Sequence, residues 1–204
     1  MAKVQKNHRI TQELIDDNPI PDDLTASEFI RDYWKLYKDN YPSNNSLNGT
    51  IFENLVIIAL AREGIENIYY QTELSFVPTA LFDAFLYNEE KPVALSIKVS
   101  LRERWKQADL EASALKQVHK KAECYVLSLN EQETRTRQNQ SADYAGLDGF
   151  ILADKPEFDE LVEDLKNREF SLAGNVPIIR SSDRVYTDDE LLDKFHFKRY
   201  IKDS

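Results

Sequence analysis

Residues Val93 to Val99, with the sequence VALSIKV, are the stretch that decides the fold. Aliphatic and β-branched residues favour an extended strand, and Lys98 stands near the end of this strand. A charged segment, Leu101 to Trp105, follows it. A helix is then predicted from about Lys106 to Lys121, with Glu111 inside it. The pattern indicates a strand that carries a lysine into a turn and a helix.

Four neighbouring segments extend this pattern in both directions. Strands are predicted at Asn67 to Phe76 and at Leu81 to Tyr87. The residues between 88 and 92 are few enough for a hairpin, so we expect the strands on either side to pair antiparallel. A helix is predicted from Thr50 to Glu63, and a further strand from Cys124 to Leu129. The order helix, three strands, helix, strand predicts an α/β fold with a mixed central sheet flanked by helices (αβββαβ).

The remaining segments are expected around this core. Residues 1–22 are polar and proline-punctuated, so we expect an irregular N-terminal arm there and a single domain over 23–204. The spacing of Thr25 and Glu28 is that of a capping box and predicts the start of a helix. Further on, we expect a polar loop at Arg135 to Gln140, a strand at Asp148 to Ala153, a helix at Glu157 to Arg168, a strand-like segment at Val176 to Arg180 and a short helix at Asp188 to Phe195.

Composition limits the classes of protein that the chain can belong to. The 204 residues are enough to bury a full core. The longest apolar run, Leu55 to Ala61, is too short to span a bilayer, so no membrane association is expected. The single cysteine, Cys124, has no intrachain partner and stands among apolar residues. We therefore expect a buried thiol in a cytoplasmic protein.

Charge is distributed unevenly along the chain. The formal net charge of −10 argues at first against nucleic acid as a partner, because neutralising phosphates is the main source of affinity there. Between Lys98 and Lys121, however, seven basic residues face three acidic ones, a net charge of +4. Between Ala122 and Glu169 there are five basic and twelve acidic residues, a net charge of −7. The distribution predicts one basic face on an otherwise acidic molecule.

Two carboxylates are candidate functional groups close to Lys98. Asp83 stands in an apolar strand, and a symmetric hairpin places it opposite Ser96 or Ile97, where it can meet Lys98. Glu111 falls on the helix face that should pack on the sheet. Each of the three residues also has an interpretation without a functional role. Asp83 could be an edge residue that faces water, Glu111 a solvated residue beside the apolar stripe, and Lys98 a lysine that reaches solvent.

Glu53 is a third candidate carboxylate, one turn before the apolar residues Val56 and Ile57. The same residue also completes a capping-box spacing with Thr50, which would need no chemistry to explain it. Both interpretations stay open from the sequence.

Taken together, Asp83, then Ser96 and Lys98, then Glu111 with twelve residues between it and Lys98, resemble the active site of PD-(D/E)XK nucleases in a permuted form. In that form the acid two positions before the lysine is replaced by a Glu on the following helix, and here Ser96 holds the emptied position. The resemblance is to the type II restriction endonucleases that read CCGG, CCNGG or CCWGG sites. It covers roughly Thr50 to Leu129, and it departs from the family name at Phe82, where the family has Pro.

The resemblance implies a restriction-endonuclease-like core and a catalytic set of Glu53, Asp83, Lys98 and Glu111. Asp83, Glu111, Glu53 and the carbonyl of Ile97 would bind one or two Mg²⁺ ions, since hard cations prefer oxygen ligands. Lys98 would orient or deprotonate the attacking water. The reaction would be hydrolysis of both strands of DNA, leaving 5′-phosphate and 3′-hydroxyl ends.

Base reading is expected directly after the lysine. In the resembled group an arginine-rich segment in this place reads C·G pairs, and Arg102, Glu103 and Arg104 stand there in this chain. Arginine can donate two hydrogen bonds to guanine, and glutamate can accept one from cytosine N4. A palindromic site containing C and G, cut in both strands, implies double-stranded DNA as the partner and a homodimer.

Three other functions compete with this one. A repair or junction-resolving nuclease of the same superfamily would keep the fold and cut according to DNA structure. An inactive DNA-binding or regulatory protein on the same fold would explain Ser96 and the acidic composition, but not an inward Glu111. A carboxylate-pair hydrolase such as a glycosidase would leave Lys98 and the charged turn unexplained.

Overall fold

The structure is a computed structural model that describes residues 2–42, 44–75, 77–102, 104–140, 144–173 and 184–199. It divides into two units. The sheet unit contains residues 67–152 and 169–185, and the helical unit contains residues 1–66, 153–168 and 186–204. We expect one domain over 23–204 from the sequence, whereas the structure divides this stretch between the two units.

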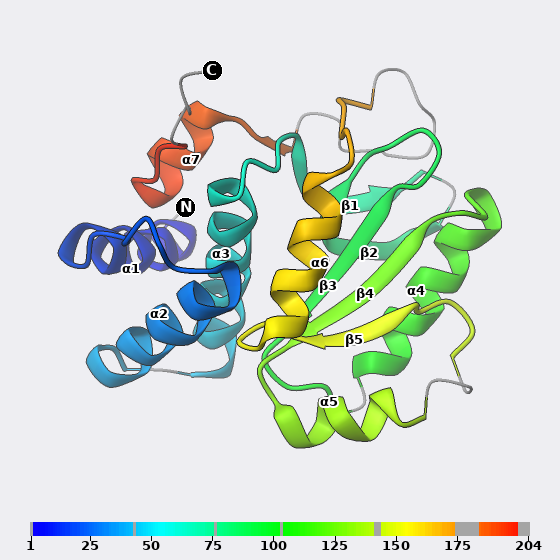
Figure 1. The fold of residues 1–204 in the computed structure, drawn as a ribbon, viewed down its shortest axis with the longest axis horizontal. Helices are drawn as coiled ribbons and strands as arrows, with labels where there is room; N and C mark the ends of the chain where they lie inside the picture. Colours follow the sequence, from blue (N-terminus) through cyan, green and yellow to red (C-terminus); the bar gives the residue numbers. More distant parts are fainter. Residues whose placement is uncertain are drawn as a thin grey trace. The chain divides into compact units, whose positions relative to one another are not determined.

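The sheet is mixed and six-stranded, in the order β5-β4-β3-β2-β1-β6. β1 pairs with β2, and β2 with β3, in the antiparallel sense, whereas β3, β4 and β5 run parallel. The bounds are Ile68–Leu74 for β1, Val77–Leu86 for β2, Val93–Lys98 for β3, Glu123–Ser128 for β4, Gly149–Leu152 for β5 and Val185–Tyr186 for β6. The predicted hairpin between β2 and β3 is confirmed, and so is the mixed α/β class (Figure 1).

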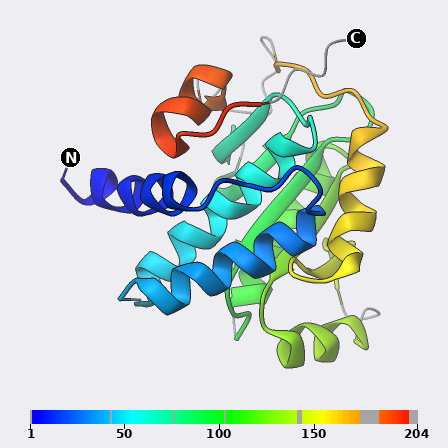
Figure 2. The same ribbon diagram turned by 60° about the vertical axis from the view of Figure 1, so that its left-hand side comes forward.

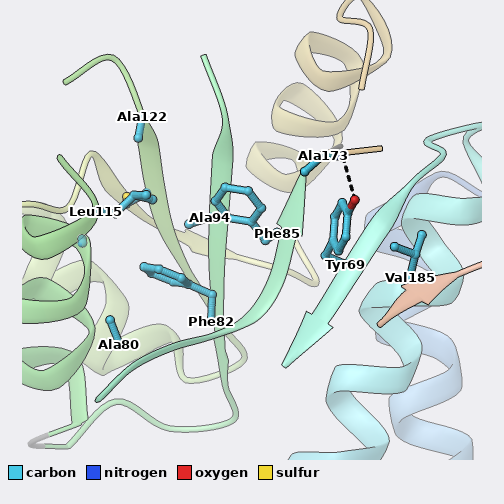
Figure 3. Packing of buried hydrophobic residues seen from close by; sticks show 11 residues of the cluster. Tyr69, Ala80, Phe82, Phe85, Ala94, Leu115, Ala122, Ala173 and Val185 are labelled. Atoms are coloured by element: carbon cyan, nitrogen blue, oxygen red, sulfur yellow. Dashed lines mark hydrogen bonds between the residues drawn. The ribbon is translucent and has the colours of Figure 1, made fainter. Parts of the chain in front are cut away.

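Helices α4 (Arg104–Val118) and α5 (Glu131–Gln138) belong to the sheet unit. Ala112 and Leu115 of α4 pack into an apolar cluster with residues of β2, β3 and β4, such as Phe85, Ala94 and Cys124. Figure 3 shows this cluster around Phe82 and Phe85, with the Tyr69 hydroxyl accepting a hydrogen bond from the main-chain amide of Ala173 at 2.7 Å. Burial of these side chains fixes α4 on the sheet. Cys124 is buried, as predicted.

A short loop holds the other side of α4. The Asp109 carboxylate accepts hydrogen bonds from the main-chain amides of Ala145, Gly146 and Leu147. Gly146 approaches the helix so closely that an added Cβ would lie 2.1 Å from the amide nitrogen of Ser113. Only glycine fits here without a shift of backbone.

The helical unit contains α1 (Ala2–Asp17), α2 (Ala26–Asn40), α3 (Asn45–Arg62), α6 (Pro156–Lys166) and α7 (Asp188–Phe195). α2 packs on α3 through contacts such as that between Trp34 and Phe52, and Figure 2 shows these two helices side by side. The predicted capping box of Thr25 and Glu28 is confirmed. Asp159 of α6 accepts hydrogen bonds from the amide and hydroxyl of Ser27 and so ties α6 to the start of α2.

Three local predictions are wrong. Residues 2–17 form α1 instead of an irregular arm, because Ile10, Leu14 and Ile15 share a buried face. Residues 131–138 form α5 instead of a polar loop, with Asn130 as the N-cap. The helix predicted to begin at Thr50 begins at Asn45 instead, with Asn44 as its cap, and this removes the capping interpretation of Thr50 and Glu53. The predicted segment 176–180 lies outside the described residues.

Candidate active site

Asp83 and Lys98 form the centre of the candidate site. The Asp83 Oδ2 atom accepts hydrogen bonds from the Lys98 ammonium and from the Ile97 amide, both at 2.6 Å. β2 and β3 pair regularly as far as Ala84 and Leu95. Beyond this pair, the Asp83 carboxylate accepts the hydrogen bond of the Ile97 amide in β3. The same carboxylate therefore binds both the main chain of β3 and the side chain of Lys98. The predicted proximity of Asp83 and Lys98 is therefore confirmed, and their catalytic roles stay predictions.

Glu111 is the second carboxylate of this site. It points inward on α4 beside Ala108, Ala112 and Leu115, as predicted, and only 8% of it is exposed. Val118, which helical periodicity places on the same face, is the last residue of the helix and is 39% exposed.

The surroundings of Glu111 act on its ionisation. Burial raises the pKa of the Glu111 carboxyl above its ordinary value of 4.5. Hydrogen bonds from Gln107 and the main-chain amide of Leu81 and the positive charge of Lys98 lower this pKa, whereas the negative charge of Asp83 raises it further. Because Lys98 and Asp83 both act electrostatically on Glu111, the three charged groups belong to one cluster. We call Asp83, Lys98 and Glu111 the charged cluster.

The charged cluster has the donor chemistry that a hard cation requires. Two carboxylates offer oxygen ligands, and a desolvated Glu111 would gain from a neighbouring positive charge. No group of three or more Asp, Glu, His or Cys side chains suited to a metal ion occurs among the described residues. Mg²⁺ ordinarily keeps several waters and substrate oxygens beside one or two carboxylates, so the residues present fit such an ion.

The other two predicted metal ligands, Ile97 and Glu53, lie outside the charged cluster as defined above. Ile97 lies next to Lys98 in β3, and its amide is bound to Asp83. Glu53 lies in the middle of α3, in the helical unit, and is partly buried. The ordinary explanation of Glu53 as a capping residue is removed by the earlier start of α3, and its role as a ligand stays a prediction.

The predicted base-reading segment follows β3 directly. Arg102 and Arg104 are exposed, and within the described part of the chain neither side chain has a partner. Arg102 has a φ of +39°, a conformation that non-glycine residues seldom adopt. Glu103 lies outside the described residues. The exposed arginines are thus available to a ligand at the end of the strand that carries Lys98.

Two residues that contact this site were missed by the sequence reasoning. Gln107 donates to the Glu111 carboxylate at 2.8 Å, and its spacing of four residues on the same helix is a signal that could have found it. Glu133 of α5 accepts from the Leu101 amide at 2.6 Å and so ties α5 to the segment after β3. Thirty-two residues separate this pair, and no local pattern announces it.

No family model, curated protein or solved structure matches the chain. Among the described residues, no helix is both long and apolar enough to cross a bilayer.

Proposed function

We propose that the chain is a Mg²⁺-dependent, sequence-specific DNA endonuclease of the type II restriction class, with a restriction-endonuclease-like core and a permuted PD-(D/E)XK site. The observation that carries the proposal is the charged cluster. A buried carboxylate on α4 and the ion pair of Asp83 with Lys98 form the combination that phosphodiester hydrolysis needs. The order of elements α3, β1, β2, β3, α4, β4 agrees with the αβββαβ order of that core.

Asp83, Glu111 and the Ile97 carbonyl would hold the ion, and the role of Glu53, which belongs to the helical unit, stays a prediction. When bound, Mg²⁺ supplies Lewis-acid stabilisation of charge on the phosphate. Lys98 carries the remaining chemistry of the chain: its ammonium orients the attacking water, whose proton leaves to solvent, and it offsets the negative charge that develops on the scissile phosphate. Gln107 fixes the Glu111 carboxylate in place.

Substrate selection is proposed for Arg102, Glu103 and Arg104, acting on a palindrome that contains C·G pairs. Bidentate arginine contacts to guanine discriminate between bases by about 1–3 kcal/mol each. Cutting both strands of a palindrome requires two copies of the site, so the active species is proposed to be a homodimer.

The test is incubation of the purified chain with plasmid and phage DNA, with and without Mg²⁺. We expect discrete fragments in Mg²⁺. Lys98→Ala and Glu111→Ala should each lower the rate at least about 100-fold, because each removes a group that acts on charge in the transition state. Lys91→Ala is the matched control, since Lys91 is an exposed lysine at the other end of β3, paired with Glu123.

Two outcomes would count against the proposal. If neither DNA is cut in Mg²⁺ or Mn²⁺, the nuclease function is wrong, and retained DNA binding would then favour an inactive DNA-binding protein. If Glu111→Ala cuts at the normal rate, the permuted site is wrong even where the chain is a nuclease.

A further inference from the structure

Five cations lie in the chain segments that follow β3 and β4, and two of them, Lys106 and Arg137, lie against the ring of Trp105. Arg102, Arg104 and Lys106 belong to the segment after β3 and the first turn of α4, and Arg135 and Arg137 belong to the last turn of α5. We call these five residues together with Trp105 the basic surface.

Contacts to the Trp105 ring hold α4 and α5 together at the basic surface. The guanidinium of Arg137 lies over the Trp105 ring at 4.5 Å, and the ammonium of Lys106 lies 5.9 Å from the same ring. Tyr144 packs edge-on against Trp105 and donates its hydroxyl to the Arg137 carbonyl. Stacking on an aromatic ring restrains a guanidinium without neutralising its charge. Arg137 is therefore held in position with its charge intact.

Each of the two α5 arginines donates a hydrogen bond to a neutral side chain. Arg135 donates to the Gln138 side chain and Arg137 to the Gln140 side chain, each through one guanidinium nitrogen. Over residues 101–106 and 131–140, five cations stand against three acids, a net charge of +2 in a chain of net charge −10. One of these acids, Glu133, already accepts from the Leu101 amide. The surface therefore favours an anionic ligand.

The position of the basic surface relative to Lys98 indicates which anion it suits. Lys98 lies opposite Ser128 at the ends of the parallel strands β3 and β4. Asn130, the N-cap of α5, follows Ser128 by two residues. Arg102 follows Lys98 by four residues. A nucleic-acid strand whose phosphate lies at Lys98 would continue over this edge. A series of guanidinium groups with planar, paired donors matches a series of phosphates.

We propose that Arg135 and Arg137 of α5, with Lys106, bind the phosphate backbone of duplex DNA without regard to its sequence. This inference rests on the proposed function and deepens it: Arg102 and Arg104 read bases, whereas the α5 arginines supply affinity and position the duplex on the charged cluster. Phosphate contacts fix register and orientation, and they carry no sequence information themselves.

The experiment measures binding of the full chain to labelled duplexes of unrelated sequence, over a series of KCl concentrations and in EDTA so that no cleavage interferes. Each lost phosphate contact should reduce the slope of log affinity against log salt by about 0.9. We expect Arg135→Ala and Arg137→Ala together to reduce the slope by about 2 and to weaken binding about tenfold or more, equally for every sequence.

Two further variants separate charge from packing. Lys120→Ala removes an exposed cation on the turn after α4, far along the helix from Trp105, and should leave the slope unchanged. Arg137→Lys keeps the charge while losing the planar stack on Trp105, so it should keep the salt slope better than Arg137→Ala. Thermal melts of each variant identify losses of binding that come from unfolding.

An unchanged slope in a folded double variant would overturn the inference, and so would a loss confined to one sequence or equal binding of single strands. These outcomes are separable from the cleavage test. A chain that binds duplex through α5 but never cuts would refute the nuclease and keep the inference. A chain that cuts, with affinity indifferent to Arg135 and Arg137, would refute the inference alone.

Discussion

Asp83 and Glu111 are the two carboxylates of the charged cluster, and their environments differ. Asp83 has a direct cation, Lys98, and a main-chain donor, Ile97. The Glu111 carboxylate accepts hydrogen bonds from two uncharged groups, the Gln107 side chain and the Leu81 main-chain amide. The charge of Asp83 is thus neutralised by Lys98. Glu111 is buried without such a partner among the described residues, and burial raises the pKa of its carboxyl.

The raised pKa of Glu111 predicts a pH-dependent stability. The folded state holds the Glu111 proton more tightly than the unfolded state, so folding stability falls as pH rises from the ordinary value of 4.5 through the raised value. Glu111→Gln removes this loss. Without divalent metal, we expect the variant to be more stable than the wild type at about pH 8, with a smaller difference at about pH 4.

Urea denaturation at both pH values checks this prediction. Glu160→Gln is the matched control, since Glu160 is an exposed residue of α6. Equal stabilisation of both variants, or a Glu111→Gln variant less stable than the wild type at the higher pH, would show that the Glu111 charge is not an unfavourable one.

At this scale the sequence predicts the charged cluster well and its supporting contacts poorly. Asp83, Lys98 and Glu111 lie on two adjacent strands and the next helix, so strand alternation and helix periodicity bring them together. The bonds of Asp83 to the Ile97 amide and of Glu133 to the Leu101 amide depend on where the pairing of β2 and β3 ends and on where α5 docks. No local pattern contains that information.

At the scale of elements, the strands and helices with strong apolar patterns are predicted within a few residues. α5 was missed because the sequence of residues 131–138, EQETRTRQ, has no apolar residue and so no stripe to detect. It is held by its Asn130 cap, by the Glu133 contact and by the stack of Arg137 on Trp105. α1 was missed because the first residues of the helix are mostly polar and a proline-containing turn follows it.

The close approach of Gly146 to α4 predicts opposite effects of the same substitution at two glycines. Gly146→Ala forces a Cβ to within 2.1 Å of backbone, so we expect a loss of about 1–3 kcal/mol of stability, or about 2–10 °C in melting temperature. Gly49→Ala, inside α3 with nothing within 4 Å of the added Cβ, should gain about 0.5–1 kcal/mol.

Differential scanning calorimetry of both variants measures this pair of effects. A neutral Gly146→Ala would mean that the loop at 144–148 yields at no cost. In that case the Asp109 contacts to this loop would contribute little to holding it on α4.

At the scale of the whole molecule, the single cysteine reports on opening of the sheet unit. Cys124 is 1% exposed in β4, and burial raises the pKa of its thiol to about 12. At about pH 8 the thiolate is therefore scarce as well as covered. We expect the folded chain to react with a thiol reagent far more slowly than a one-cysteine peptide, and the denatured chain to react at the peptide's rate.

The rate of labelling should rise with denaturant along the same curve as the loss of secondary structure measured by circular dichroism. Rapid labelling of the folded chain would contradict the buried position of Cys124. Labelling that precedes the loss of structure would show that the sheet unit opens locally around β4.

The division into two units limits how recombination of the gene can rearrange the protein. The chain passes from one unit to the other after residues 66, 152, 168 and 185. Neither unit is therefore encoded by one uninterrupted stretch of gene. Recombination at a single pair of breakpoints cannot duplicate, exchange or fuse either unit intact. An exchange that moves the charged cluster therefore either leaves residues 169–185 of its unit behind or carries residues 153–168 of the helical unit with it.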